Sequence, residues 1–272
     1  MTTTESTLKI KANNIAISYT EAGPAEAPAI IFIHGFPLNK SMWNKQIDAL
    51  KDQYRVIAFD VRGHGESEAG DDHFSINLFV SDLISFMENL AIKKAILCGL
   101  SMGGYIALYA AQKHPDLFNA LILSDTSCAA DTTEAKHRRI MAIEDIKING
   151  LKNFANNSIT NLFAPGSLIS KSQEISLVRD MIMNTSSQSI YNTMHALAIR
   201  METCSRLHEI KIPVLILVGI DDIITPLSSA KVMHENITDS KLTIIEHAGH
   251  LSNLENPFEF NYLIKKFIET VY

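Results

Sequence analysis

Cysteine, positive charge and long apolar runs are all scarce in this chain of 272 residues. The three cysteines, Cys98, Cys128 and Cys204, form no CxxC pair and leave an odd count, so we expect neither a disulfide framework nor a zinc knuckle. Such cysteine usage is typical of the reducing cytosol. Lys and Arg number 24 against 30 Asp and Glu, a formal charge of −6. Because no basic excess can neutralise phosphates, nucleic-acid binding is not expected.

Hydrophobic segments long enough for a membrane are also missing. The longest apolar runs, Ala29–Ile33 and Val214–Ile220, are far shorter than the roughly 18 residues that a spanning helix needs. The N-terminal MTTTESTLKI has neither the positive nor the apolar region of a secretory signal. With 46% hydrophobic and 20% charged residues, the composition fits one large α/β domain. We expect a cytoplasmic protein, monomeric or homodimeric, with no membrane or nucleic-acid partner.

Apolar runs of strand length alternate with helical periodicity over most of the chain. A continuous run such as Ala29–Ile33 fits a strand that is buried on both faces, as in a parallel sheet. The expected strands are 8–12, 15–19, 29–33, 55–60, 94–98, 120–124, 214–219 and 242–246, and the expected helices are 40–51, 75–90, 102–114 and 257–272. Between Asp125 and Arg206 this alternation stops and helical periodicity takes over. We interpret residues 126–206 as a helical cap, inserted between residues 1–125 and 207–272, the two parts of a core α/β domain.

The pentapeptide Gly99-Leu100-Ser101-Met102-Gly103 follows the pattern G-x-S-x-G. An apolar strand precedes it and an apolar helix follows, which is the context of a nucleophile elbow. The serine of an elbow lies in a sharp turn, so its neighbours two before and two after must lack bulk. The helix dipole at this position favours developing negative charge. Ser101 is therefore the expected nucleophile.

A serine hydroxyl is a poor nucleophile without an adjacent base, and the segment after the last strand supplies two histidines. We choose His250, because the loop must leave the strand before it can reach over the elbow, and interpret His247 as a structural loop residue. The base also needs a carboxylate that orients it. Asp222, four residues before Pro226, is our choice for it.

Two other aspartates remain as alternatives for the orienting carboxylate. Asp221 is the neighbour that could cap or solvate the same turn, and Asp125 ends an earlier strand. With Asp222 as the acid, the order is Ser101…Asp222…His250, the nucleophile–acid–base order of one particular fold.

The oxyanion of an acyl transfer needs two hydrogen-bond donors. We expect the N–H of Met102, directly after the nucleophile, and the N–H of Phe36, in the loop His34-Gly35-Phe36-Pro37. The sequence leaves open whether the Phe36–Pro37 peptide bond is cis, and His34 is interpreted as a brace for this loop. The ten histidines are scattered without metal-ligand spacing, so we expect neither a metal nor a cofactor.

These motifs together resemble those of the α/β-hydrolase superfamily. The resemblance rests on HGFP (34–37), DVRGHG (60–65), GLSMGG (99–104), the turn 222–226 and HAGH (247–250). It implies an α/β-hydrolase fold, with a mostly parallel eight-stranded sheet, helices on both faces and a helical cap after strand 6. It also implies structural roles for Asp60, Arg62 and His64.

The branch that the chain resembles includes carboxylesterases, 3-oxoadipate enol-lactonase and cofactor-free haloperoxidases. The resemblance implies a serine hydrolase that cleaves small-molecule esters or lactones through an acyl-enzyme intermediate. Haloalkane dehalogenases and epoxide hydrolases are disfavoured, because they use an aspartate where Ser101 stands. A perhydrolase with the same triad and a ligand receptor with slow turnover are the alternative functions.

The cap is expected to roof the active site and to set substrate choice. One version is an apolar, adaptable wall made by Phe154, Leu162, Phe163 and the cap methionines, since Met side chains repack at little cost. These methionines, half of the ten in the chain, are Met141, Met181, Met183, Met194 and Met201. The alternative, which we favour for any single methionine, is that it only fills the core of the cap itself. The other version is a wall that holds a substrate carboxylate through Arg138, Arg139 and Arg200.

Overall fold

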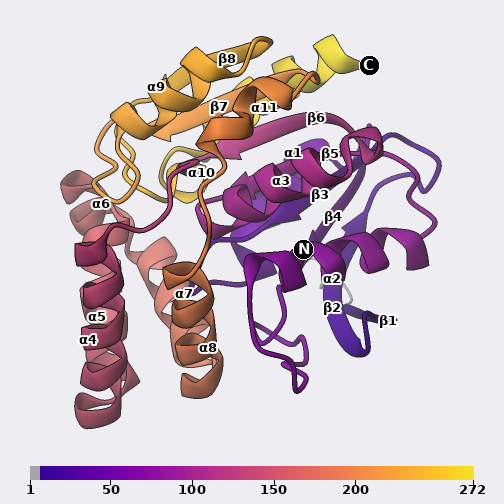
Figure 1. Ribbon diagram of the computed structural model, residues 1–272. Coiled ribbons are helices and arrows are strands. Elements are labelled where there is room, and N and C mark those ends of the chain that lie inside the picture. The colour runs from indigo at the N-terminus through magenta and orange to yellow at the C-terminus, as the bar shows by residue number, and fades with distance from the viewer. Residues whose placement is uncertain (1–6) are drawn as a thin grey trace.

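The structure is a computed structural model that describes residues 7–272 (Figure 1). Its strands are β1 (Leu8–Ala12), β2 (Ile15–Ala22), β3 (Ala29–Ile33), β4 (Arg55–Phe59), β5 (Ala95–Leu100), β6 (Phe118–Ser124), β7 (Val214–Gly219) and β8 (Ser240–Ile245). The α-helices of the core are α1 (Asn44–Leu50), α2 (Ile76–Asn89), α3 (Met102–Lys113), α9 (Leu227–Asn236), α10 (Ser252–Glu255) and α11 (Pro257–Val271). Between β6 and β7 lie α4 (Thr133–Asn149), α5 (Leu151–Leu162), α6 (Pro165–Ser170), α7 (Ser172–Met183) and α8 (Ser187–Ala198).

The strands in the described part of the chain form one eight-stranded sheet with the order β1-β2-β4-β3-β5-β6-β7-β8. β2 pairs antiparallel with both β1 and β4, and every other neighbouring pair is parallel. The predicted α/β-hydrolase fold with its mostly parallel sheet is confirmed. The largest boundary difference is in β2, which continues three residues beyond the predicted end because Tyr19–Ala22 pairs with β4.

Side chains alternate between the two faces of the sheet, and helices cover both. In β3, Ile31 and Ile33 join the apolar cluster that includes α2, α3 and α9. Ile30 and Phe32 join the cluster that includes α1, α10 and α11. Because β3 is buried on both faces, its sequence is a continuous apolar run rather than an alternating one.

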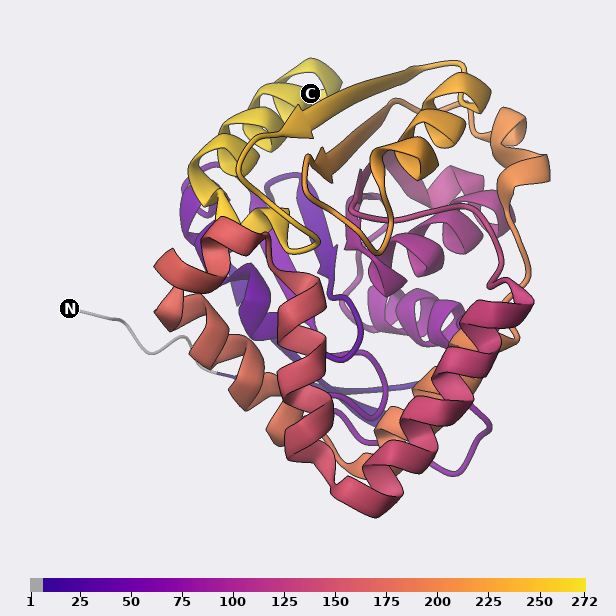
Figure 2. The same cartoon turned by 90° about the vertical axis from the view of Figure 1, so that its left-hand side faces the viewer.

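The helices between β6 and β7 gather beside the sheet, as Figures 1 and 2 show. Thr132 and Ser186 cap α4 and α8 by accepting hydrogen bonds from backbone N–H groups of the first turns. Gly150, with φ 78°, makes the sharp connection from α4 to α5. Side chains of α5 and α7, such as Ile159 and Val178, pack into the same apolar cluster as α1 and α11.

The carboxyl ends of the parallel strands meet at one edge of the sheet. Ser101 follows β5, Asp125 follows β6, and Asp222 and His250 stand in the loops after β7 and β8. Segments that are far apart in sequence therefore converge at this edge, where ligands of open α/β sheets bind. Within residues 7–272, no helix combines the length and apolarity that crossing a bilayer requires.

Candidate active site

Ser101 occupies the strained turn that joins β5 to α3. Its φ of 55° and ψ of −114° lie outside the regions that ordinary residues prefer. A Cβ atom on Gly99 would stand 2.2 Å from the carbonyl oxygen of Gly103, and one on Gly103 would stand 2.1 Å from that of Ile33. Any side chain at either glycine would force the turn apart. The geometry predicted for a nucleophile elbow is therefore present.

His250 and Asp222 form a buried pair at the same edge. Nδ1–H of His250 donates to Oδ2 of Asp222 over 2.9 Å, and the two residues are only 2% and 4% exposed. Asp221 and His247, the neighbouring alternatives, are exposed. With Nδ1 bonded to the carboxylate, Nε2 is the imidazole nitrogen that remains for proton transfer.

Thr225 completes the environment of the Asp222 carboxylate. Its N–H donates to Oδ1 over 3.0 Å, and its hydroxyl donates to Oδ2 over 2.8 Å. Burial alone would raise the pKa of Asp222, but the His250 cation and these hydrogen bonds lower it below its usual value. Burial likewise opposes a charged His250, yet Asp222, Asp125 and Glu255 outweigh it and raise the pKa of this histidine. An imidazolium is thus stabilised at this position.

The loop after β3 carries Phe36, whose N–H is the second donor predicted for the oxyanion. Phe36 and Met102 line the same cavity, and the N–H of Met102 belongs to the first turn of α3, whose N–H groups lack intrahelical partners. The Phe36–Pro37 peptide bond is cis. His34 braces the loop as predicted, because its ring is hydrogen-bonded to the Gly35 carbonyl (2.9 Å) and accepts from the Val61 N–H (2.9 Å). Burial lowers the pKa of His34 to about 4, so the ring is neutral.

A cavity of about 670 Å³ opens over these groups. Ser101, His250, Phe36 and Met102 all line it. No hydrogen bond joins the Ser101 hydroxyl to His250 in the described structure; in ligand-free enzymes such bonds often tighten only when substrate binds. These four residues, which come from three separate motifs, therefore share one site of a size typical for small-molecule ligands.

Cap residues complete the cavity, but of the five cap methionines only Met194 lines it. Phe154, Leu162 and Met194 line it, whereas Phe163 is buried away from it. Met181 lies in the core cluster and does not reach the cavity. The remaining cap methionines are solvent-exposed rather than part of the wall: Met141, Met183 and Met201.

The three cap arginines all line the cavity, and they differ in their partners. Arg139 and Arg200 both form ion pairs with Asp131, and the Arg200 guanidinium stacks 4.2 Å from the centre of the Tyr105 ring. Arg138 takes part in no salt bridge within residues 7–272. Of the charged cap residues that line the cavity, three are arginines and one is Asp131, while Glu134, which does not line it, interacts electrostatically with Arg138.

The DVRGHG segment has the structural role that was predicted for it. Asp60 accepts a hydrogen bond from the buried ammonium of Lys40 over 2.7 Å. Arg62 binds Asp82 through two hydrogen bonds, with both side chains buried. His64 is buried beside them, and burial lowers its pKa to about 3, so it is neutral. None of these side chains lines the cavity.

Glu255 is a buried residue of the site region that sequence reasoning missed. One carboxylate oxygen accepts from the N–H groups of Gly249 (2.9 Å) and Leu251 (3.3 Å), on either side of His250. The other accepts from the N–H of Ala164 in the cap, over 2.8 Å. Glu255 thereby fixes the histidine loop and ties it to the cap. Nothing in the segment Leu254-Glu255-Asn256 distinguishes it from an exposed helical glutamate, so the sequence carried no signal.

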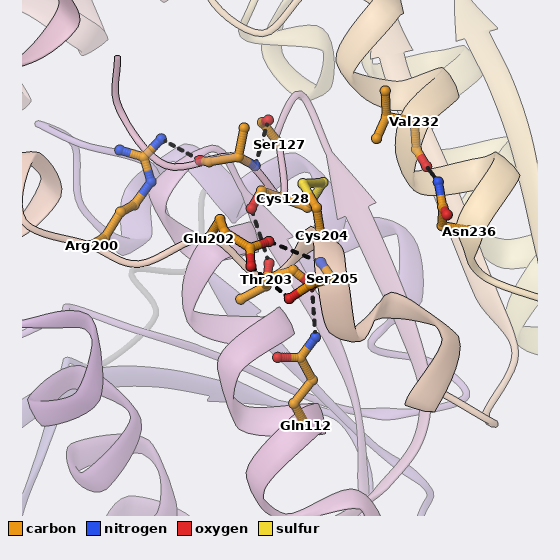
Figure 3. The surroundings of a disulfide bond; sticks show 11 residues. Gln112, Ser127, Cys128, Arg200, Glu202, Thr203, Cys204, Ser205, Val232 and Asn236 are labelled. Atoms are coloured by element: carbon orange, nitrogen blue, oxygen red, sulfur yellow. Dashed lines mark hydrogen bonds between the residues drawn. A yellow bond between two sulfur atoms is a disulfide. The ribbon is translucent and has the colours of Figure 1, made fainter. Parts of the chain in front are cut away.

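Cys128 and Cys204 form a disulfide, with Cα atoms 4.8 Å apart although 76 positions separate them in sequence (Figure 3). The prediction of no disulfide is wrong, and the cysteine count no longer indicates a reducing compartment. Cys128 follows β6 and Cys204 precedes β7, which are neighbouring strands, so both ends of the cap return to one place. The odd cysteine, Cys98, is a buried free thiol.

We call the segments 126–131 and 200–206, which lead into and out of the cap, the neck. Besides the disulfide, the Thr203 N–H donates to the Cys128 carbonyl over 2.8 Å, and Arg200 donates to the Ala129 carbonyl over 2.9 Å (Figure 3). Gln112 of α3 donates to the Thr203 carbonyl over 3.1 Å. The two segments of the neck are therefore joined to each other and to α3, the core helix that begins directly after Ser101.

Residues 28–257 match the family described as alpha/beta hydrolase fold. The chain belongs to the alpha/beta hydrolase family. The 3-oxoadipate enol-lactonase 2 of Acinetobacter baylyi is 30% identical, over 94% of this chain and 94% of its own length. A thermophilic esterase from Thermogutta terrifontis has a closely similar structure, with a TM-score of 0.92 at 30% identity over 98% of this chain and 99% of its own. The predicted resemblance to carboxylesterases and enol-lactonases is confirmed.

A relative with a different name matches almost as fully. The proline iminopeptidase of Lactobacillus helveticus is 29% identical over 90% of this chain and 91% of its own length. Family membership therefore establishes the fold, while the bond that is cleaved has to be argued from the cavity and its walls.

Proposed function

We propose that the protein is a serine hydrolase that cleaves carboxylic esters or lactones of small molecules. The observation that carries the proposal is the convergence of four groups on one cavity. These groups are the strained Ser101, the Asp222-bound His250 and the two backbone donors at Phe36 and Met102. Acyl transfer needs a nucleophile, a base that a carboxylate orients, and an oxyanion site in this relation.

Acylation begins when Ser101 Oγ attacks the substrate carbonyl and His250 Nε2 takes the hydroxyl proton. Asp222 keeps the imidazole in the required tautomer and stabilises the imidazolium that forms. The N–H groups of Phe36 and Met102 hold the oxyanion of the tetrahedral intermediate. When this intermediate collapses, the bond from carbonyl carbon to leaving oxygen breaks, and the imidazolium protonates the leaving alkoxide.

Deacylation repeats these steps with water as the nucleophile. His250 takes a proton from water, the hydroxide attacks the acyl carbon, and Ser101 leaves with the proton that the imidazolium returns. In a lactone the alcohol stays joined to the acyl group, so ring opening yields one hydroxy acid. Because His250 must be neutral to act, activity rises as pH passes its raised pKa.

The arginine wall favours, within this class, substrates that carry a carboxylate. Within residues 7–272 Arg138 forms no salt bridge, although it interacts electrostatically with Glu134 on the same helix, and it lines the cavity that contains Ser101. Arg139 and Arg200 share Asp131 and so keep one excess positive charge between them. Guanidinium groups bind carboxylates through paired, charge-assisted hydrogen bonds. Phe154, Leu162 and Met194 provide the apolar part of the same wall.

A substrate panel tests the proposal. Purified protein is assayed with activated acetate and butyrate esters, a neutral lactone, and a lactone of similar size with a carboxylate, alongside labelling by a fluorophosphonate probe. We expect turnover and labelling at Ser101, with faster turnover of the acidic lactone. Failure of every ester and lactone, together with no labelling, would overturn the proposal. Tight binding with turnover slower than once a minute would favour the receptor alternative.

A further inference from the structure

Asp125 is a fully buried carboxyl group that the mechanism above does not use. It directly follows β6 and is 0% exposed. Its side chain makes no hydrogen bond to His250, so it does not replace Asp222 as the orienting acid. A buried carboxylate is costly unless hydrogen bonds or charges compensate it, so its contacts indicate what it is for.

Those contacts join the loops that carry Asp222 and His250. Oδ1 of Asp125 accepts from the N–H of Gly219, three residues before Asp222, over 2.8 Å. Oδ2 accepts from the hydroxyl of Ser252, two residues after His250, and from the hydroxyl of Ser124 (2.7 Å). One carboxylate thus connects the end of β7 with the segment that follows β8.

The charges around Asp125 are those of the candidate site itself. Burial raises the pKa of Asp125 to about 7, and the charge of Asp222 adds to the effect while the His250 cation opposes it. Asp125 in turn helps to raise the pKa of His250, together with Asp222 and Glu255. Burial, and to a smaller extent the charge of Asp125, also raises the pKa of the Cys98 thiol.

We propose that Asp125 is a positioning residue for the proposed hydrolysis, on which this inference rests. Its carboxylate fixes the loop that carries Asp222 relative to the loop that carries His250. It also places a second negative charge near the imidazolium that forms during acyl transfer. Asp222 orients His250 by direct contact, whereas Asp125 acts through Gly219, Ser252 and the electrostatic field. The site would then contain two buried carboxylates with different roles.

Asp125→Asn is the variant that separates charge from shape. Asp125 has φ 46°, a conformation that Asn also adopts readily. The Asn carbonyl oxygen can still accept from the Gly219 N–H, and its amide can donate to the Ser252 and Ser124 hydroxyls. The substitution therefore removes the charge and retains a partner for each neighbouring group.

The experiment is the pH dependence of kcat/KM for an activated ester and of the rate of Ser101 labelling by a fluorophosphonate. For Asp125→Asn we expect the midpoint of the acid limb to lie lower than in the wild type by about half a pH unit or more, because an anion that favours the charged histidine is gone. The maximal kcat should fall about tenfold, since the imidazolium loses part of its stabilisation. Asp221→Asn is the matched control: it removes an exposed charge one residue from Asp222 and should leave the midpoint unchanged.

A second variant keeps the inference testable if Asp125→Asn does not fold. Ser252→Ala removes one hydrogen bond to the carboxylate, so Asp125 is neutral over a wider pH range, and the midpoint should move in the same direction by less. A midpoint equal to that of the wild type in both variants would overturn the inference. A wild type that neither turns over esters nor reacts with the probe would instead overturn the proposed function, so the two failures are distinguishable.

Discussion

The edge of the sheet and the cap above it differ in how tightly their side chains are held. At the edge, Ser101, Asp222 and His250 are at most 8% exposed. In the cap, Ile140 and Met141 of α4 are 51% and 54% exposed. Among the described residues, the cluster that joins α4, α8 and the Phe36 loop contains four buried members: Ile143, Ile146, Ile190 and Met194.

From this difference we assign the chemical step to the edge of the sheet and substrate choice to the cap. Backbone atoms lie so close to Gly99 and Gly103 that no side chain fits at either position, so the turn that carries Ser101 is tightly confined. The cap wall includes long side chains that can rearrange, such as Arg138 and Arg139. We therefore expect changes at the edge to abolish turnover and changes in the cap to alter which substrate is preferred.

The largest expected effect is that of Ser101→Ala. Loss of the hydroxyl removes the covalent step, which cost about 10⁶-fold in kcat in the triad enzyme where it was measured. Thermal unfolding should change little, because the small alanine fits the same turn. Hydrolysis of an activated acetate ester and circular dichroism measure the two outcomes. A variant that keeps a tenth of wild-type kcat, with contamination excluded, would refute Ser101 as the nucleophile.

Neighbouring aspartates give the next largest contrast. Asp222→Asn should lower kcat about 10⁴-fold, because the amide leaves His250 in the wrong tautomer. Asp221→Asn should stay within about twofold, since Asp221 is exposed and its charge is screened by solvent. Steady-state kinetics of both variants on one ester test this. The opposite result would show that the acid is misplaced by one residue.

The edge could be predicted from sequence because local patterns determine it. Buried parallel strands leave continuous apolar runs, and chemistry-bearing residues follow these strands directly, as Ser101 follows β5. The choice of Asp222 over Asp221 used only the distance to Pro226, and burial now favours the same residue. Because the motifs that contain these site residues are short and rigid, the spacing of the residues in sequence largely determines their geometry.

Other features depend on contacts that no local pattern encodes. Cys128 and Cys204 are adjacent only because the chain leaves and re-enters the sheet at neighbouring strands. Glu255 binds backbone N–H groups of the histidine loop, and Thr225 binds the carboxylate of Asp222. The tertiary fold determines where these partners lie. The cap has helical periodicity on several faces, so the sequence could not distinguish Met194, which lines the cavity, from exposed Met201.

A smaller effect is expected in the cap wall. Arg138→Gln should lower kcat/KM about tenfold for a carboxylate-bearing lactone, because an ion pair with substrate is lost, and should leave a neutral ester of the same size within twofold. Arg206→Gln is the matched control, as it removes an exposed arginine that does not line the cavity. Equal losses on both substrates would mean that Arg138 stabilises the structure of the cap rather than binding the substrate carboxylate.

The smallest effect on turnover is expected at the neck. Replacing Cys128 and Cys204 by serine removes a cross-link that closes a long loop, and should lower the free energy of unfolding by about 4 kcal/mol. Ser127, Ala129 and Arg200 of the neck line the cavity, so a looser neck should raise KM about two- to fivefold. The kcat for an acetate ester should change by less than about twofold, because Ser101 and His250 are held by the core.

Chemical denaturation and Michaelis kinetics of the oxidised wild type, the reduced wild type and the double serine variant measure these outcomes. The reduced wild type and the double variant lack the same bond and should coincide. The double variant itself should not respond to the reductant, because Cys98 is then its only cysteine and is buried. A fall in kcat at unchanged KM would contradict the assignment of chemistry to the sheet edge and substrate choice to the cap. It would mean that the neck fixes the elbow rather than shaping the cap wall of the cavity.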